Sequence, residues 1–204
     1  MLVWRISVFS LSALPFAWVV SQALLNRLGV DPVKELLDFL GHSALTLLLV
    51  TLCMTPLRLI HGWRGWQLVR RQLGLWAFTY ACLHMLVFAG LMIEWDAVRL
   101  WVELGRRPYV LIGSLALAGL LLLAITSNRY SMRRLGVRWK SLHRLVYPAL
   151  ILVLLHYLWV VRSDIAFWLF YAFAGSALLL FRLPMVQKRV LFTFRGLTSK
   201  STAL

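Results

Sequence analysis

The sequence predicts an all-α integral membrane protein, a bundle of six transmembrane helices with both termini in the cytoplasm. Its composition, six long uncharged windows and the placement of its basic residues support this fold class. Of the 204 residues, 61% are hydrophobic and only 14% are charged. A soluble domain would be roughly half apolar, with about a quarter of its residues charged. We therefore expect the surplus apolar surface to face lipid.

Six uncharged windows have the length that a membrane helix requires, about 17–25 residues. The first follows Arg5, as a signal peptide could, but its apolar run is too long and no small-x-small cleavage site follows. We therefore expect a retained first span and a single domain over residues 1–204. The windows are residues 6–26, 39–57, 72–93, 108–128, 145–161 and 165–181.

The basic residues indicate the orientation. The segments outside the windows, which are the two termini and the connections, must lie alternately on the two sides of the membrane. The set that begins with the N-terminus holds sixteen of the 22 Lys and Arg residues and no acidic residue. That set includes both termini, and an excess of Lys and Arg marks cytoplasmic loops. Because the basic residues lie in short runs between apolar stretches, the net charge of +15 does not indicate nucleic-acid binding. The opposite set holds all seven acidic residues: Asp31, Glu35, Asp38, Glu94, Asp96, Glu103 and Asp164.

Two histidines lie deep within predicted spans on different helices. His84 is near the middle of the window 72–93, and His156 is similarly deep in the window 145–161. Both windows run outward from the cytoplasm, so the two imidazoles are expected at similar depth. An ionisable residue within the membrane is a functional-site hypothesis, and paired imidazoles are suited to the axial ligation of a haem iron. The alternative is that each ring forms an interhelical hydrogen bond to a backbone or hydroxyl group.

His143 lies thirteen residues before His156, close to the cytoplasmic start of the fifth window. On a continuous helix the two would be about 19.5 Å apart, too far to share one iron. Pro148 lies between them and could kink the helix, which would bring the rings closer to one face. His143 is therefore either a ligand of a second cofactor or an interfacial residue that binds a lipid phosphate beside Arg144.

Four other candidate ligands have simpler explanations. His42 and His61 lie near the predicted membrane surfaces, where we expect no cofactor role. Cys53 and Cys82 lie within apolar stretches without any motif spacing, which is typical of packing residues.

The connections are short and lack a glycine-rich nucleotide-binding pattern, so a nucleotide or nicotinamide site would have to belong to another chain.

Six motifs spread over essentially the whole chain point to a known family. These motifs, together with the histidines in the third and fifth of six spans, resemble the ferric reductase-like transmembrane domain superfamily, which includes the NADPH oxidases. Within it, the sequence is similar to the haem-bearing membrane subunits of periplasmic methionine sulfoxide reductase systems in Gram-negative bacteria. The motifs are DPVKELLDFLG (31–41), TPLR (55–58), RRQLGLWAFTYACLH (70–84), RRPYVLIG (106–113), RLGVRWKSLHRLVY (134–147) and HYLW (156–159).

This resemblance implies a multi-pass inner-membrane protein that passes electrons to a periplasmic molybdopterin enzyme, which reduces methionine sulfoxide in damaged proteins. It implies haem b and FMN as cofactors, and the quinone pool or a flavin reductant as the electron donor. By the same resemblance, His84 and His156 would hold a haem b towards the periplasmic side. His143 would be a further haem-related position.

One position departs from the broader superfamily, whose two-haem members carry a pair of histidines in the third span. Fourteen residues before His84, this chain has Arg70. A guanidinium stays protonated and is a poor iron ligand, but it could pair with haem propionates or an FMN phosphate. A second haem would then be held asymmetrically by His143, or the site would be a flavin or quinone pocket. The segment 105–109, GRRPY, is expected to contact haem propionates or the partner, or simply to begin the fourth span at Pro108.

Three functions remain compatible with the sequence. The spans hold no paired carboxylates and no nucleophile–base pair, so an electron-transfer subunit fits better than a complete enzyme, with sulfoxide reduction in the partner. A free-standing ferric or quinone reductase would use the same haem. A small transporter or scaffold would use the histidines to relay protons or to hold helices together.

Overall fold

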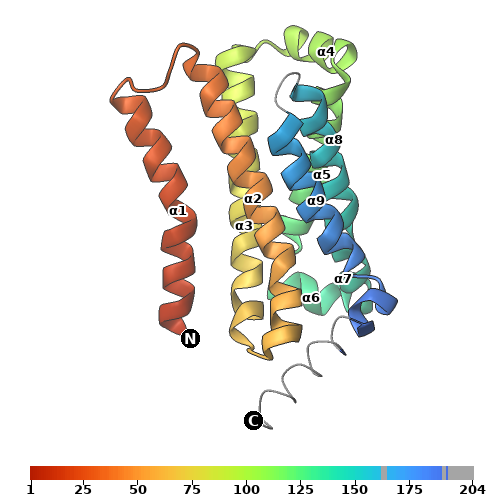
Figure 1. Cartoon of the computed structure of the whole chain (residues 1–204). Coiled ribbons are helices and arrows are strands. Elements are labelled where there is room, and N and C mark those ends of the chain that lie inside the picture. Colours follow the sequence, from red (N-terminus) through yellow and green to blue (C-terminus); the bar gives the residue numbers. More distant parts are fainter. Residues whose placement is uncertain (162–164, 190–191, 193–204) are drawn as a thin grey trace.

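The computed structural model describes residues 1–161, 165–189 and 192, and the regular structure within these residues is helical. Figure 1 shows the long helices side by side, with α4 (Ala97–Arg106) lying across one end of the bundle. We call this end the α4 end, and the opposite end, where the chain begins, the N-terminal end. The predicted outer-loop acid Asp164 and the tail from residue 193 lie outside the described residues.

Five helices within the described residues are long and apolar enough to cross a membrane, and each overlaps one of the first five predicted windows. The sixth window forms α9 (Ile165–Leu180), an apolar helix of only 16 residues. The five are α1 (Leu2–Leu24), α2 (Pro32–His61), α3 (Gly65–Val87) with the π-helical turn η1 (Phe88–Met92), α5 (Pro108–Ile125), and the run Val137–Val160 that ends in α8 (Val146–Val160).

The helix α2 is much longer than its predicted window. It begins at Pro32, because the Asp31 side chain accepts a hydrogen bond from the backbone N–H of Lys34. It ends at Gly62, which has a φ of 71° and closes the helix in the left-handed conformation. The window 39–57 was too short because it was bounded by charged residues, whereas a helix can carry charges in its first turns where they face the membrane surface.

The connection before α5 contains a helix that the sequence analysis did not predict. Glu94 and Trp95 have positive φ values of 58° and 59°, which reverse the chain after η1. The Asp96 side chain then caps α4 by accepting hydrogen bonds from the backbone N–H groups of Val98 and Arg99.

The chain is irregular in the turn just before Pro148, which includes Arg144, the residue whose carbonyl a proline at 148 would crowd in a regular helix. Two short helices, α6 (Arg129–Leu135) and α7 (Val137–Leu142), are followed by a 3₁₀ turn, η2 (His143–Leu145). Regular α8 begins only at Val146, so Pro148 falls in its first turn, where a backbone N–H would have no helical partner. His143 therefore lies in the irregular turn and not on the same regular helix as His156.

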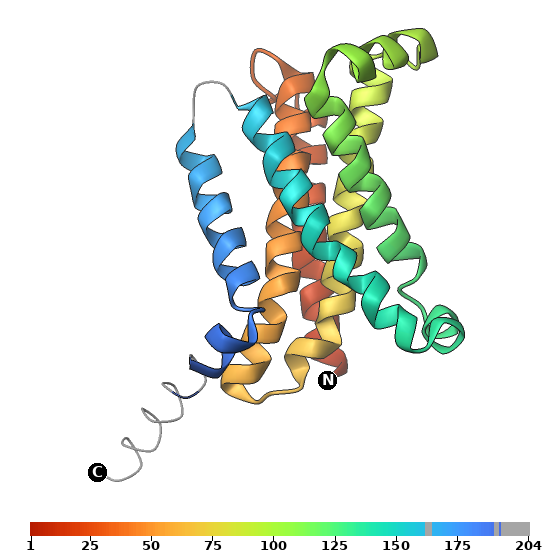
Figure 2. The ribbon, with the colours of Figure 1, turned by 90° about the vertical axis from the view of Figure 1, so that its right-hand side faces the viewer.

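Two helical hairpins form the centre of the bundle, α2 with α3 and α5 with α8. In Figure 2 both run from the α4 end to the N-terminal end and back. A buried apolar cluster joins all four helices, with Leu52, Ala77, Leu120 and Leu150 contributed by α2, α3, α5 and α8. The cluster fixes the two hairpins against each other, which determines how residues on α3 and α8 face across the bundle.

The first and last helices are at the edges, α1 in Figure 1 and α9 in Figure 2. The fully buried Tyr80 hydroxyl on α3 donates to the Ser12 carbonyl at 2.8 Å and accepts from the Phe16 N–H at 2.9 Å. The hydroxyl therefore lies between the Ser12 carbonyl and the Phe16 N–H, which would otherwise form a hydrogen bond with each other within α1. On the other edge, the Trp168 indole donates to the Leu154 carbonyl and attaches α9 to α8.

Candidate functional site

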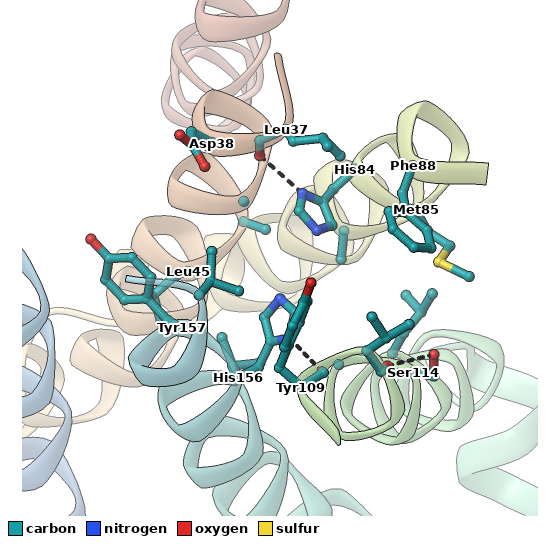
Figure 3. Close-up of a pocket in the computed structure, with 18 of the residues that line it drawn as sticks. Leu37, Asp38, Leu45, His84, Met85, Phe88, Tyr109, Ser114, His156 and Tyr157 are labelled. Carbon is teal, nitrogen blue, oxygen red and sulfur yellow. Dashed lines mark hydrogen bonds between the residues drawn. The ribbon is translucent and has the colours of Figure 1, made fainter. Parts of the chain in front are cut away.

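A cavity of about 340 Å³ lies between α2, α3, α5 and α8 towards the α4 end. The exposed area of its walls is largely apolar, and His84 and His156 are among the polar side chains that line it. Cavities that hold small ligands are of this kind, roughly 300–1,000 Å³ with a few placed polar groups. Figure 3 shows His84 reaching into the cavity from α3 and His156 from α8.

The predicted match in depth between His84 and His156 is confirmed. Their ring centroids are 6.2 Å apart and their planes are inclined at 89°. An imidazole nitrogen binds a transition metal at about 2 Å and lies about 1 Å from its ring centre, so two imidazoles on opposite sides of one ion have centres roughly 6 Å apart. The observed separation therefore fits a pair of rings that share one metal ion.

Each ring is oriented by a backbone carbonyl on the first helix of its hairpin. Nδ1 of His84 donates to the Leu37 carbonyl at 2.9 Å, and Nδ1 of His156 donates to the Tyr109 carbonyl at 2.7 Å. A carbonyl oxygen can only accept, so Nδ1 carries the proton and Nε2 of the neutral ring keeps its lone pair. These are the interhelical hydrogen bonds of the alternative interpretation, but they occupy only one nitrogen of each ring. Metal-bound histidines usually donate their other N–H in this way.

A glycine lies beneath each imidazole. A Cβ atom on Gly113 would come within 2.8 Å of Nδ1 and 2.9 Å of Cε1 of His156. A Cβ atom on Gly41 would be 3.4 Å from Nδ1 of His84. Only glycine leaves room for the ring of His156 at its observed position, because real Cβ contacts do not approach 2.8 Å.

The two hairpins therefore repeat one arrangement. In each, the histidine of the second helix donates to a carbonyl 47 residues earlier on the first helix and lies over the glycine one helical turn after that carbonyl. The sequence analysis identified the histidines but not the glycines or the repeat. The sequence does contain one sign of the repeat, because Gly41 and His84 are separated by as many residues as Gly113 and His156. The apolar residues around the two pairs are otherwise dissimilar.

Residues 40–154 match the family described as "Ferric reductase like transmembrane component". The chain is also 41% identical over 189 residues to the "Protein-methionine-sulfoxide reductase heme-binding subunit MsrQ" of Rhodospirillum rubrum, with 91% of this chain and 90% of the relative covered. The chain belongs to the MsrQ family of ferric reductase-like transmembrane proteins. The resemblance drawn from the sequence motifs is thus confirmed.

Two cationic side chains line the cavity of this MsrQ-family protein at the α4 end, Lys34 and Arg107. The Arg107 guanidinium donates to the Tyr109 hydroxyl at 2.9 Å and pairs with the Glu103 carboxylate at 2.6 Å. The hydrogen bond to Tyr109 and the nearby carboxylate raise the pKa of Arg107, which therefore stays charged. In the segment GRRPY, Pro108 is the first residue of α5, as the simpler expectation has it, and Arg107 and Tyr109 line the cavity. Contact of this segment with haem propionates or with a partner stays a prediction.

His42 also lines the cavity, but both of its ring nitrogens have partners. Nδ1 donates to the Asp38 carbonyl at 2.6 Å, which leaves Nε2 to accept from the Tyr157 hydroxyl at 2.8 Å. His61 ends α2 at the N-terminal end of the bundle, with its ring 6.5 Å from that of Trp66. These contacts agree with the expectation that neither histidine is a cofactor ligand, which stays a prediction.

His143 and Arg70 lie in the other half of the bundle, and neither lines the cavity. The His143 ring stacks on the Trp139 ring, with centroids 4.0 Å apart, and its Nε2 lies 3.2 Å from the Thr126 hydroxyl oxygen. The structure thus separates these two predicted site residues from His84 and His156. Among the described residues, no three His, Cys, Asp or Glu side chains come together as a metal cluster.

Proposed function

We propose that this protein is the haem b-binding electron-transfer subunit of a methionine sulfoxide reductase system. It would carry electrons across the bacterial inner membrane to the periplasmic molybdopterin enzyme MsrP, which reduces methionine sulfoxide in oxidised periplasmic proteins. The observation that carries the proposal is the pair His84 and His156, two half-buried imidazoles 6.2 Å apart whose Nδ1 groups are both occupied by carbonyls. The R. rubrum relative is named as a heme-binding subunit, which supports the same assignment.

The residues around the cavity fit haem b in their chemistry. His84 and His156 would hold the haem iron through Nε2, with Gly41 and Gly113 leaving space for the rings. Haem, when bound, supplies a one-electron redox centre, and the chain supplies its ligands, its orientation and a dry pocket. Lys34 and Arg107 would neutralise the propionates at the α4 end, because carboxylates pair with cationic side chains.

We propose that α9 is the sixth span and that the whole chain is one six-span domain. The indole of Trp168 holds α9 against α8, and the Thr46 hydroxyl lies 2.9 Å from the Tyr171 hydroxyl, which joins α9 to α2. A 16-residue apolar helix can serve as a span where the bilayer thins or flanking residues reach the interface. The excess of Lys and Arg at the N-terminal end favours cytoplasmic termini, so the α4 end would be periplasmic.

The partner MsrP would dock at the α4 end, where all the acidic residues of the described part of the chain lie. Electrons would enter from the quinone pool or a flavin reductant in the cytoplasmic half. His143 and Arg70 would form the second cofactor position there, for a further haem, FMN or a quinone. The protein would then be an electron-transfer subunit, with the sulfoxide chemistry in its partner.

The first test is the dithionite-reduced minus oxidised absorption spectrum of the purified protein. Sharp Soret and α bands are expected from the wild type and from the control variants His42→Ala and His61→Ala. The same sharp bands are expected to be lost in His84→Ala and His156→Ala, because each variant removes one of the two residues that would hold the haem iron. A featureless spectrum from folded protein produced with ample haem would overturn the proposal and favour a transporter or scaffold.

A second experiment separates the proposed subunit from a free-standing reductase that uses the same haem. The dithionite-reduced protein is mixed with the periplasmic reductase or with a ferric chelate, and haem reoxidation is followed optically. The proposal expects the dedicated partner to reoxidise the haem far faster than the chelate. The opposite order would favour a ferric reductase.

A further inference from the structure

The helix α4 carries an apolar stripe that no other described part of the chain covers. Val98 is 73% exposed, Trp101 78% and Val102 38%. Residues three and four positions apart lie on the same side of a helix, so these side chains form one continuous surface. We call Val98, Trp101 and Val102 the α4 stripe. Exposed apolar surface that is gathered in this way marks a place of contact with a membrane or another molecule.

The charged residues of α4 are gathered on a different side of the helix. At about 100° per residue, Arg99, Glu103 and Arg106 fall within a sector of about 60°. Trp101 points about 140–160° away from all three of these residues. A helix that lies in the plane of a membrane surface has this division, because one side enters the lipid and the other stays in water.

The chain holds α4 at the level where the neighbouring spans end. Only residues 93–96 separate η1 from α4, and only Arg107 separates α4 from α5. The Trp95 N–H donates to the Ala89 carbonyl of η1 at 2.8 Å, and the Glu103 carboxylate pairs with the Arg107 guanidinium at 2.6 Å. Figure 1 and Figure 2 show α4 lying across the end of the bundle and not along it. This is the orientation that a helix in the membrane surface requires.

The chain on both sides of α4 is also apolar and exposed. Leu91 and Met92 at the end of η1 are 56% and 44% exposed, and Leu111 in the first turn of α5 is 47% exposed. They belong to helices that are long and apolar enough to cross a membrane, so we expect their exposed sides to contact lipid. The exposed Trp95 and Trp101 lie at the same end, and tryptophan is enriched at membrane surfaces. The α4 stripe therefore continues a lipid-facing surface.

We propose that α4 lies in the headgroup region of the phospholipid bilayer, with the α4 stripe against the acyl chains and the charged sector in water. A soluble partner would approach from the water and would meet the charged sector, from which Trp101 points away. Burial of the stripe in lipid removes its apolar surface from water, which is favourable. Only the assignment of α4 to the periplasmic leaflet rests on the orientation given under the proposed function.

The test measures which side of α4 faces lipid. Cys53 and Cys82 are replaced by alanine, and a nitroxide label is attached to Val98→Cys, Arg99→Cys or Leu115→Cys of the full chain in phosphatidylcholine nanodiscs. Leu115 is 53% exposed on α5 and serves as the lipid-facing control. Power-saturation electron paramagnetic resonance then compares collisions of each label with oxygen, which concentrates among acyl chains, and with a water-soluble nickel chelate.

The proposal expects an oxygen-to-nickel collision ratio at Val98→Cys that is at least severalfold higher than at Arg99→Cys and close to that at Leu115→Cys. Equal ratios at positions 98 and 99, with nickel reaching both labels, would overturn the proposal, because the stripe would then face water. Exclusion of both reagents from position 98 would also overturn it. In that case another protein, such as a second copy of this chain, would cover the stripe.

A second pair of labels makes the result independent of any one variant. Trp101→Cys lies on the α4 stripe and Arg106→Cys in the charged sector, so the same difference in collision ratio is expected between them. The labels report the position of α4 whether or not haem is bound. A negative result would therefore leave the haem proposal standing, and absence of the Soret band would leave the position of α4 in the membrane surface standing.

Discussion

Gly113 on α5 lies directly beneath the imidazole of His156 on α8, where a Cβ atom would meet Nδ1 at 2.8 Å. The ring has little freedom to move away, because the same nitrogen donates to the Tyr109 carbonyl at 2.7 Å. The glycine and the carbonyl together fix the direction in which Nε2 points. Gly113 is therefore a positioning residue for the proposed ligand.

We expect Gly113→Ala to lower the haem-to-protein ratio at least severalfold, because the methyl group displaces the ring from its carbonyl partner. Gly41→Ala should have a smaller effect, since its methyl group would meet His84 only at 3.4 Å. The control is Gly119→Ala on α5, whose methyl group would lie 3.7 Å from the Cβ of Ala149, an ordinary contact. Pyridine haemochrome absorbance per mole of protein measures the ratio. Equal haem content in Gly113→Ala and Gly119→Ala would contradict the positioning role.

His42 provides a second test, because it lines the cavity with both ring nitrogens occupied. His42→Ala is expected to keep the Soret and α bands of the wild type at close to full intensity. Its reduced-minus-oxidised spectrum would be compared with that of His84→Ala at equal protein concentration. Loss of the bands from well-folded His42→Ala would make His42 a ligand and would revise the proposed pair.

The sequence was sufficient to predict the membrane class, the first five spans and the pairing of His84 with His156, because each depends on hydrophobicity or helical rise over many residues. It was not sufficient for Gly41 and Gly113, since a glycine on an apolar helix has a function only through the ring that packs on it from another helix. The same limit applies to Arg182, whose Nη2 donates to the Leu52 carbonyl of α2 at 2.7 Å, a contact between residues far apart in the sequence.

The helix α4 was missed for a different reason. Its charged residues fall in a segment that was interpreted as a connection because it interrupts the uncharged windows. Yet Val98, Trp101 and Val102 recur at helical spacing and form an exposed apolar stripe, with Arg99 and Glu103 on other faces. Counting only the absence of charge therefore finds spanning helices but not amphipathic ones.

Arg107 predicts a charge effect on the redox potential of the bound haem. Its pKa is raised by the Tyr109 hydroxyl and the nearby carboxylate, so the guanidinium stays charged throughout the neutral pH range. Arg107→Gln should lower the midpoint potential by on the order of tens of millivolts, because a removed positive charge no longer favours the added electron. The difference from the wild type should be constant between about pH 6 and pH 9, since Arg107 does not titrate there. Spectroelectrochemical titration at several pH values measures it, with exposed Arg71→Gln as the control.

Tyr80 supports the prediction that α1 is held to the bundle through one hydroxyl. Tyr80→Phe removes the group that donates to the Ser12 carbonyl and accepts from the Phe16 N–H. We expect a loss of about 1–2 kcal/mol in the free energy of unfolding, within the range for hydrogen bonds between membrane helices. Unfolding in mixed SDS micelles measures the change, and Tyr130→Phe is the matched control because Tyr130 is exposed. The haem spectrum should be unchanged, since Tyr80 does not line the cavity. Equal stability of the two variants would show that α1 is retained by apolar packing alone.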